Sequence, residues 1–447
     1  MAERLGEHAV VIGGSMAGLM TARVLADFFR WVTVFERDQI EDRPAIHKSI
    51  PQGNHVHALL LGGQRVMSGL FPGFAEEMKS AGAVPYTISR DLVWYGPGGK
   101  GYSVNGSVRE PRDFGFGSYS LSRGLLEHLM RRRTAALANV KIETGLAIEG
   151  LVHDDGRVRG VRTRAGGSQE VEADLVVDAG GRTSHAPRWL AAMGMPTAEE
   201  TTIGVDFAYT STKFRNTGGL EEPLSFFGGP PPNTRGGAIF AIEDDTWHVA
   251  LGGRFGDYPP TDVDGFFAYA EGIPNPGLYE AIKDAERIAD LSHHRFATSV
   301  QRHYERLTVF PENFLVVGDA IASFNPVYGQ GMSSAAQQVA ALDQILRERA
   351  SESRTIAGIA TVFFAKAAEV ISAPWMLAAS ADFAYPQTKG ERPPGFAEAG
   401  AYFAALDAMQ AEDVEVSRLL AEVFQLTKPL SVLLEEPLRT RVMGRLQ

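Results

Sequence analysis

The sequence predicts an α/β fold that carries an inserted antiparallel sheet and a helical C-terminal region. Residues 8–35 contain an apolar run, a glycine turn, a run of small and apolar residues and a second apolar run, which is the pattern of a βαβ unit. Residues 197–299 alternate β-branched and aromatic residues around turn-forming stretches such as "GGPPPN", as antiparallel strands do. After "ENFLVVGDA" the chain is rich in alanine, which favours helices, and prolines divide it into segments.

The charge balance and the absence of cysteine exclude several classes of protein. The chain of 447 residues has 43 Lys and Arg against 54 Asp and Glu, a net charge of −11 without long runs of one sign, so we expect no nucleic-acid partner. Without cysteine there are no disulfides, thiolate metal sites, iron–sulfur clusters or cysteinyl cofactor links. No secretory leader precedes the first strand, and no stretch approaches the roughly 18 uninterrupted apolar residues of a membrane span. We therefore expect a cytoplasmic protein with no transmembrane segment.

The first glycine turn, "GGSMAG", fits a dinucleotide-binding motif. Gly13, Ser15 and Gly18 occupy the G-x-G-x-x-G frame directly after a strand and at the start of a helix, and Glu36 ends the next strand. The helix N-terminus offers backbone donors to a pyrophosphate, and Glu36 can accept hydrogen bonds from a ribose. Ser15 departs from the motif at the position where glycine allows the closest approach of a phosphate. The sequence predicts an adenine dinucleotide here, with Arg37 included in the site.

A second glycine turn, far along the chain, predicts that this dinucleotide is a non-covalently bound FAD. In "NFLVVGDAIASFNPVYGQGMSSAAQQV" an apolar strand ends at Gly318 and Asp319, and a glycine-containing loop opens a helix. A nicotinamide dinucleotide needs only the first turn, whereas the flavin ring lies far from the adenosine and needs a second anchor. Asp319 can bind the ribityl hydroxyls, and the helix start can face the N1 and C2 carbonyl edge of the ring. The expected residues of this anchor are Asp319, Pro326, Gly329, Gln330, Gly331 and Met332.

The order "GGSMAG", "SRGLLE", a sheet region, "GDA…GQGM" and then helices resembles the FAD-dependent monooxygenases of the para-hydroxybenzoate hydroxylase fold over about the whole chain. The resemblance implies a Rossmann-type FAD-binding domain in two parts, at 1–196 and 300–350. It implies a substrate domain built on an antiparallel sheet at 197–299 and a C-terminal helical region at 351–447. It also implies that Arg123, in "SRGLLE", reaches the FAD phosphates and ribose.

A narrower resemblance lies in "KSIPQGNHVHALLLGGQRVMSGLFPG", "ASFNPVYGQGMSSAA" and "SADFAYPQ". These segments look like the squalene-epoxidase-like flavin epoxidases of polyether-antibiotic pathways, which oxidise alkenes in apolar chains. The resemblance implies that Gln52, His55 and His57 belong to a loop near the flavin. An equally open interpretation is that the two histidines only form hydrogen bonds with backbone groups. No third ligand follows "NHVH" at a diagnostic spacing, so we expect no metal site.

Two departures from the resembled family bear on the electron donor and on proton transfer. The family's "GADGxxS" reads "DAGGRTS" here, with Gly180 where the aspartate is expected and Asp178 two residues earlier, which puts tight use of NADPH in doubt. "GDAIA" lacks the histidine that many relatives carry after "GDAA", which argues against a polar proton relay beside the ring. We expect either NAD(P)H or a partner flavin reductase as the electron donor.

The resemblance implies oxygen insertion through a C4a-hydroperoxyflavin, as alkene epoxidation or hydroxylation in natural-product biosynthesis. The reaction uses O2 and a small apolar substrate. Because the flavin carries this chemistry, we assign no catalytic residue. Aromatic side chains that could line the substrate channel, with core packing as the alternative for each, are Trp94, Phe207, Tyr209, Phe226, Phe227, Phe240 and Phe324.

Three other functions stay open. A flavin-dependent alkene reductase of the geranylgeranyl-reductase type shares both glycine turns. A flavin halogenase is disfavoured because its W-x-W-x-I-P signature is absent, since no two tryptophans lie two positions apart among Trp31, Trp94, Trp189, Trp247 and Trp375. A flavin-binding protein without activity would account for the altered "DAGGRTS" segment.

Overall fold

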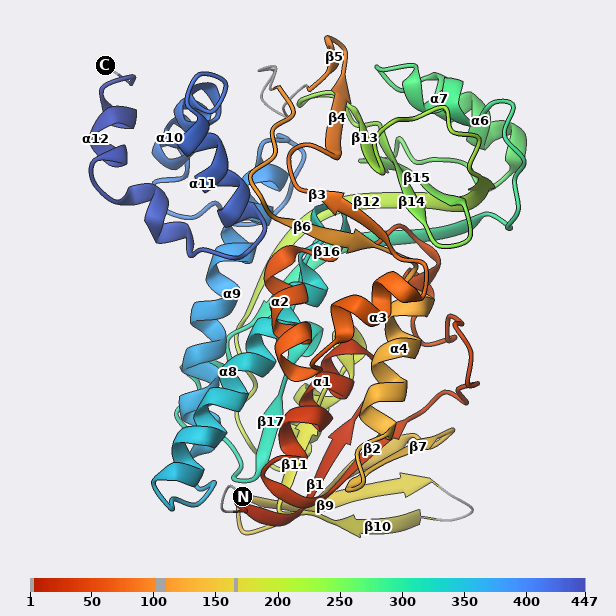
Figure 1. The fold of residues 1–447 in the computed structure, drawn as a ribbon. Coiled ribbons are helices and arrows are strands. Elements are labelled where there is room, and N and C mark those ends of the chain that lie inside the picture. The colour runs from red at the N-terminus through yellow and green to blue at the C-terminus, as the bar shows by residue number, and fades with distance from the viewer. Residues whose placement is uncertain (1–3, 102–109, 165–167, 447) are drawn as a thin grey trace.

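The computed structural model describes residues 4–101, 110–164 and 168–446 (Figure 1). It confirms the predicted fold class, because it combines a parallel sheet, a large mixed sheet that is mainly antiparallel, and a helical C-terminal region. In Figure 1 the parallel sheet lies in the lower half, the large sheet crosses above it, and the last helices, in blue, lie at the upper left.

The parallel sheet has five strands in the order β17-β11-β1-β2-β7. Its central strand, β1, ends in the apolar run 9–12, in which Val10 and Val11 are fully buried, as expected for a parallel strand covered on both faces. Val11 lies in register with Val177 on one side and Val34 on the other. The strands are β1 (Gly6–Ile12), β2 (Phe29–Glu36), β7 (Val140–Thr144), β11 (Leu175–Asp178) and β17 (Phe314–Val316).

Helix α4, beside the parallel sheet, begins at a serine that caps it. Ser122 is this N-cap, because its Oγ accepts a hydrogen bond of 3.2 Å from the Leu125 N–H. The first helix packs on β1 and β2 and contacts α4 and α8. The helices around the parallel sheet are α1 (Met16–Leu25), α2 (Leu61–Leu70), α3 (Phe74–Ser80), α4 (Arg123–Ala135), α5 (Ala186–Ala192) and α8 (Gly331–Ser351).

A separate three-stranded antiparallel sheet contains a hairpin closed by the two-residue turn Asp155-Gly156. Asp155 and Gly156 form the turn with φ angles of +44° and +71°, the left-handed conformations that a two-residue hairpin of this kind requires. Glycine and aspartate tolerate this conformation at little cost. The strands are β8 (Ile148–Asp154), β9 (Arg157–Arg164) and β10 (Ser168–Glu172).

The large sheet has eight strands in the order β18-β16-β12-β15-β14-β13-β4-β5. Its pairs are antiparallel except that β4 runs parallel to β13, which brings in a segment from outside 197–299. Helices α6 (Val263–Glu271) and α7 (Gly277–Ile282) pack on it. The strands are β4 (Leu92–Gly96), β5 (Gly99–Lys100), β12 (Glu200–Arg215), β13 (Leu224–Gly228), β14 (Gly236–Ile242), β15 (Thr246–Arg254), β16 (Ser292–Arg302) and β18 (Ala322–Ser323); β3 (Val84–Thr87) and β6 (Gly117–Ser120) pair separately.

The C-terminal helices pack in two separate apolar cores. Helix α9 (Ile359–Phe383) joins the main core, where Phe363 and Phe364 are buried. Helices α10 (Phe396–Met409), α11 (Val414–Phe424) and α12 (Leu438–Met443) share a small apolar core of their own. In the described part of the chain, α9 is long and apolar enough to cross a membrane by length and composition, with a mean hydropathy of 1.4. One side of the helix, which includes Ile371 and Trp375, packs in the protein core.

Candidate functional site

A single cavity of about 1420 Å³ lies between the parallel sheet, the large sheet and the C-terminal helices. Of the site residues predicted from the sequence, only Gly18 lies outside its lining. The lining residues from that prediction are Gly13, Ser15, Glu36, Arg37, Gln52, His55, His57, Trp94, Arg123, Phe207, Tyr209, Phe226, Phe227, Phe240, Asp319, Phe324, Pro326, Gly329, Gln330, Gly331 and Met332.

The first glycine turn forms a tight cradle at one end of this cavity. Gly13 has a φ angle of +102°, and a Cβ atom there would lie 2.6 Å from the carbonyl oxygen of Ala179. A Cβ atom at Gly18 would lie 1.8 Å from the carbonyl oxygen of Gly13. Neither position can carry a side chain without a backbone shift, so the two glycines bring the start of α1 against the end of β1.

Glu36 stands at the end of β2 with its carboxylate fixed by the backbone. Oε2 accepts the Gly14 N–H at 2.8 Å, and Oε1 accepts the Asp38 N–H at 2.9 Å. The side chain is buried, with 5% of its surface exposed, yet it lines the cavity. Each carboxylate oxygen can accept a further hydrogen bond, so Glu36 is a placed acceptor at this end of the cavity.

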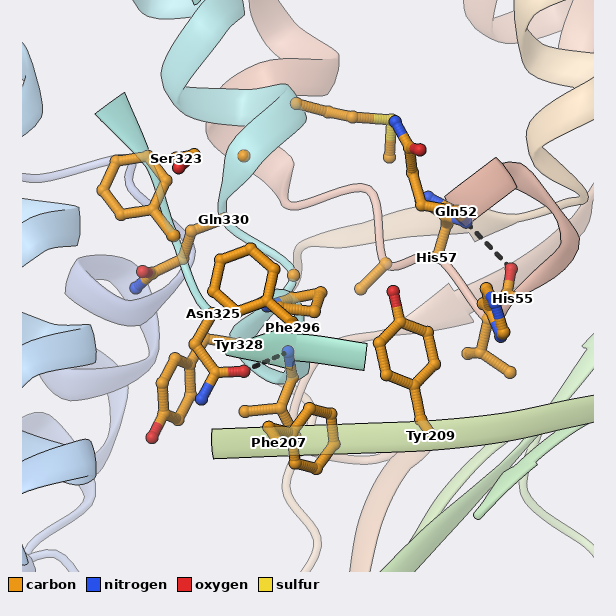
Figure 2. A pocket seen from close by; sticks show the side chains of 18 of the residues that line it. Gln52, His55, His57, Phe207, Tyr209, Phe296, Ser323, Asn325, Tyr328 and Gln330 are labelled. Carbon is orange, nitrogen blue, oxygen red and sulfur yellow. Dashed lines mark hydrogen bonds between the residues drawn. The ribbon is translucent and has the colours of Figure 1, made fainter. Parts of the chain in front are cut away.

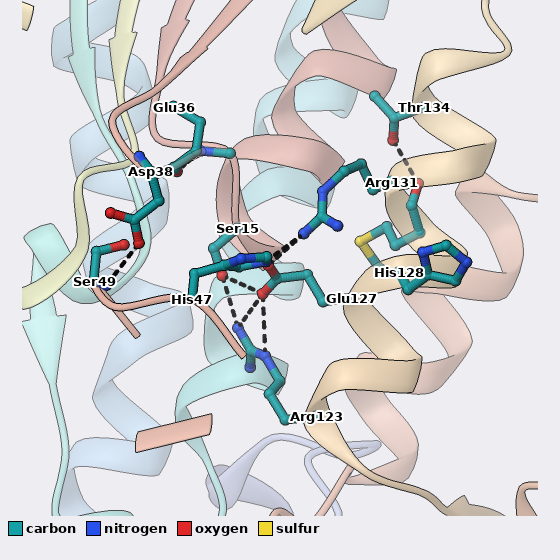
Figure 3. A network of polar contacts seen from close by, with 12 residues as sticks. Ser15, Glu36, Asp38, His47, Ser49, Arg123, Glu127, His128, Arg131 and Thr134 are labelled. Carbon is teal, nitrogen blue, oxygen red and sulfur yellow. Dashed lines mark hydrogen bonds and ion pairs between the residues drawn. The ribbon is translucent and has the colours of Figure 1, made fainter. Parts of the chain in front are cut away.

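Ser15 links the first glycine turn to helix α4 (Figure 3). Its hydroxyl donates to Glu127 Oε2 at 2.7 Å and accepts from Arg123 Nη2 at 2.8 Å. A glycine at this position would lose both contacts. The network gives a physical reason for the departure from the glycine motif at Ser15, and the role of Glu127 in it was missed by the sequence analysis.

Glu127 is the centre of this buried network. Arg131 Nη2 donates to Oε1 at 2.7 Å, and His47 Nε2 lies 3.3 Å from the same oxygen. Burial alone would raise the pKa of Glu127, but contacts with His47, Arg123, Ser15 and Arg131 outweigh it and lower the pKa to about 2. The spacing of four residues between the charges on α4 could have revealed the network.

The second glycine turn begins beside the first, where a Cβ atom on Gly318 would lie 3.0 Å from the Ala17 Cβ. Asp319 lies in a short 3-10 turn, η4 (Gly318–Ala320), after β17, and burial raises its pKa against the opposing charges of Arg123 and Arg182. The Gly329 φ angle is +64°, and a Cβ atom there would lie 2.8 Å from the Ala58 Cβ. Helix α8 begins at Gly331, so its first N–H groups open toward the cavity lining.

The "DAGGRTS" segment is internally bonded. Asp178 Oδ1 accepts the Gly180 N–H at 2.7 Å, and Oδ2 accepts the Ser184 hydroxyl at 2.6 Å. A Cβ atom on Gly180 would lie 2.8 Å from Asp178 Oδ1, so an aspartate cannot occupy position 180 beside Asp178 as it is placed here. Arg182, from the same segment, lines the cavity and lies over the Phe296 ring at 4.2 Å.

The "NHVH" histidines line the cavity without forming a metal centre. His55 Nδ1 lies 2.8 Å from Ser211 Oγ, and His57 Nδ1 lies 2.8 Å from the His55 carbonyl oxygen (Figure 2). Burial lowers the pKa of His55 to about 2, with smaller contributions from neighbouring histidines, and lowers that of His57 to about 4, with a contribution from Arg123. No group of three or more potential metal ligands occurs among the described residues. Gln52, in the 3-10 turn η1 (Pro51–Asn54), lines the cavity beside them.

The opposite end of the cavity is aromatic. Trp94 stacks on Phe226 with ring centroids 4.6 Å apart, and Phe226 meets Phe240 edge-on at 5.2 Å. Phe403 and Phe424, from α10 and α11, line the same end and were not predicted as site residues. Phe207 and Tyr209 stack at 5.5 Å nearer the histidines.

Hydrogen bonds between Gln425 and the start of α2 help to hold the C-terminal helices over this end, and Gln337 of α8 donates to the Leu426 carbonyl oxygen at 2.6 Å. Gln425 Oε1 accepts the Leu61 N–H at 2.9 Å, and the Gln425 carbonyl oxygen accepts the Gly62 N–H at 2.8 Å. These bonds satisfy two free donors of the first turn of α2. A Cβ atom at Gly62 would lie 2.3 Å from the Leu426 carbonyl oxygen, so the glycine allows the close contact.

Comparisons with known proteins place the chain in a family. Residues 114–372 match the model of the tryptophan halogenase family. Protein Rv3254 of Mycobacterium tuberculosis is 34% identical over 395 residues, which cover 86% of this chain and 82% of that protein. The flavin-dependent brominase Bmp2 superposes with a TM-score of 0.72 at 15% identity, covering 99% of this chain and 100% of that chain. The p-nitrophenol 4-monooxygenase PnpA of Pseudomonas putida DLL-E4 gives 0.64 at 16% identity, covering 95% and 99%.

The two solved structures share the fold with this chain, and the family follows from the sequence match. The family model matches more than half of the chain although the W-x-W-x-I-P signature is absent. The absence of the signature therefore does not exclude membership of the family. The chain belongs to the tryptophan halogenase family, a family of flavin-dependent oxidoreductases.

Proposed function

We propose that this chain is an FAD-dependent monooxygenase that transfers one oxygen atom from O2 to an apolar organic substrate. The observation that carries the proposal is the single cavity, with glycine turns and cationic side chains at one end and aromatic side chains at the other. A cofactor bound along the first part would present its ring toward the second. Family membership supports a flavin-dependent oxidoreductase.

The residues present fit FAD. The cradle at Gly13 would be filled by a Cβ atom, and the start of α1 points its free N–H groups into the cavity, where they would hold the pyrophosphate. Glu36 would accept from the adenosine ribose, Arg123 would contact the phosphates, and Asp319 would bind the ribityl chain. When reduced, FAD supplies the activation of dioxygen, and the protein positions the substrate and excludes water.

We infer that the substrate is an alkene in an apolar chain, such as a polyene or terpenoid. Hydroxylation of a phenol gains from a base whose pKa is near the working pH. Burial lowers the pKa of His55 to about 2 and of His57 to about 4, which makes both poor bases for that role. Epoxidation of an alkene needs no base, and the aromatic end of the cavity offers apolar contact for such a chain.

We propose a separate flavin reductase as the electron donor ahead of direct use of NAD(P)H. The resemblance implies that the aspartate of the family's "GADGxxS" segment touches both FAD and the nicotinamide donor. Here both oxygens of Asp178 are engaged, by Gly180 and by Ser184. Asp178 is 1% exposed and is thus held within its own turn, and glycine stands at position 180, where the family carries its aspartate.

Halogenation is the second candidate function, and the family match is the observation that favours it. The brominase Bmp2 has the same fold as this chain. Alkene reduction of the geranylgeranyl-reductase type is a further alternative, and it predicts a product that gains hydrogen instead of oxygen. A flavin-binding protein without activity would yield no product at all.

One assay separates these functions. The purified protein is loaded with FAD, supplied with a flavin reductase and NADH, and given squalene, farnesol or styrene in air, with and without bromide. We expect products that have gained one oxygen atom, detected by mass spectrometry, and no such product from the Asp319→Ala variant. Brominated products formed only with bromide would replace the proposal by halogenation. Hydrogenated products that also form without oxygen would replace it by alkene reduction.

A further inference from the structure

A buried carboxylate behind the second glycine turn joins three parts of the fold. Asp382, on α9, has no exposed surface. Its Oδ1 accepts from Arg254 Nη1 at 2.9 Å, from Asn325 Nδ2 at 2.8 Å and from the Tyr328 hydroxyl at 2.7 Å. Arg254 comes from β15 of the large sheet, and the other two donors flank the turn that precedes Gly329. Residues that lie more than fifty positions from Asp382 in the sequence thus meet at one of its oxygen atoms.

The cluster fixes the turn at both of its ends. Asn325 Oδ1 accepts the Val327 N–H at 3.3 Å, so the residue that Asp382 holds also caps the turn. Figure 2 shows Asn325, Tyr328 and Gln330 together on one side of the cavity, across from His55 and His57. The turn leads directly into Gly331 and α8. Its position therefore sets where the first N–H groups of α8 face the cavity.

The cluster contains one buried pair of opposite charges. Arg254 is buried, with 5% of its surface exposed, and Asp382 is its ion-pair partner. Arg254 also lies over the Tyr385 ring at 4.7 Å and lines the cavity. Asp382 Oδ2 has no hydrogen-bond partner in the described part of the chain. An unpaired buried oxygen is costly, so a carboxylate kept only for stability would be an inefficient choice here.

We propose that Asp382 is a positioning residue for the flavin ring, which holds the Asn325–Gly331 turn in place and balances the charge of Arg254 beside the ring site. The inference rests on the proposed FAD site. It assigns two separable effects to Asp382: one on cofactor affinity through the turn, and one on the reduction potential through charge. Reduction adds negative charge to the ring, so an unbalanced Arg254 favours the reduced form.

The test measures FAD affinity and reduction potential for a set of variants. For Asp382→Asn we expect at least a tenfold stronger preference for reduced over oxidised FAD, a positive shift of about 30 mV for a two-electron couple. The double variant Asp382→Asn with Arg254→Gln removes both charges and should return the potential toward that of the wild type. Tyr328→Phe removes the hydrogen bond that the Tyr328 hydroxyl donates to Asp382 and the one it accepts from Arg254 Nη2, without changing charge, so it should weaken FAD binding several-fold and leave the potential unchanged.

The controls keep this inference separate from the proposed function. Glu280→Gln breaks an exposed ion pair with Lys283, neither of which lines the cavity, and should leave both FAD affinity and potential unchanged. A wild-type protein that does not bind FAD would contradict the proposed function itself. FAD binding with an unchanged potential in Asp382→Asn and unchanged affinity in Tyr328→Phe would overturn the role of Asp382 alone. Should Asp382→Asn fail to fold, the Tyr328→Phe result decides the positioning effect.

Discussion

Replacing Glu127 by glutamine tests whether the buried network that links the first glycine turn to α4 is held by charge. Glu127 is 3% exposed and Arg123 is 8% exposed, so solvent screens their interaction little. The contacts with His47, Arg123, Ser15 and Arg131 outweigh the effect of burial and lower the pKa of Glu127 from 4.5 to about 2. At about 1.4 kcal/mol per pKa unit, this corresponds to about 3 kcal/mol at neutral pH.

The same magnitude follows from the general cost of about 3–5 kcal/mol for removing one partner of a buried ion pair. The assay is urea unfolding followed by far-UV circular dichroism, for the wild type and for Glu127→Gln, from pH 7 to pH 3. Because the folded pKa is lower than the unfolded value, the carboxylate stabilises the fold above about pH 4.5 and loses this contribution as the pH falls toward 2. The difference between the two proteins should therefore shrink below pH 4.5. A difference under about 0.5 kcal/mol at pH 7 would refute the reasoning.

Three further predictions concern the cavity. Gly18→Ala places a Cβ 1.8 Å from the Gly13 carbonyl oxygen and should cost about 1–3 kcal/mol in urea unfolding and weaken FAD binding, whereas Gly69→Ala, with open space around it, should do neither. Asp319→Ala should lose FAD during gel filtration and keep the wild-type circular dichroism spectrum; full retention of FAD would contradict its role. The imidazole NMR signals of His55 and His57 should not titrate between pH 5 and 8, because burial lowers their pKa values to about 2 and about 4. A titration near pH 6.5 would contradict that burial.

The parts of the site that depend on local backbone geometry were predictable from the sequence. Gly13, with a φ angle of +102°, has a turn conformation that other residues rarely adopt. A short segment of sequence is therefore enough to predict the turn. The DG turn at Asp155 and Gly156 is predictable for the same reason. The strand alternation that predicted the large sheet is equally local.

The contacts between distant segments were not predictable in this way. Asp382 and Arg254 are 128 positions apart, and their pairing depends on how α9 packs against the large sheet. The parallel pairing of β4 with β13 depends on topology in the same way. Nothing in the sequence around Phe424 distinguishes it from other apolar helix residues. It lines the cavity in the folded chain, where its neighbour Gln425 contacts α2. Such residues become visible as site residues only when the chain is folded.

The central claim is that one cavity brings FAD-activated dioxygen to an apolar alkene. The most direct measurement is the product of a converted alkene formed under isotopically labelled dioxygen in ordinary water, analysed by mass spectrometry. The account predicts that the product carries one labelled oxygen atom, and that the label disappears when labelled water and ordinary dioxygen are used instead. A product that carries no oxygen from dioxygen, or that carries halogen or hydrogen in its place, would contradict the account.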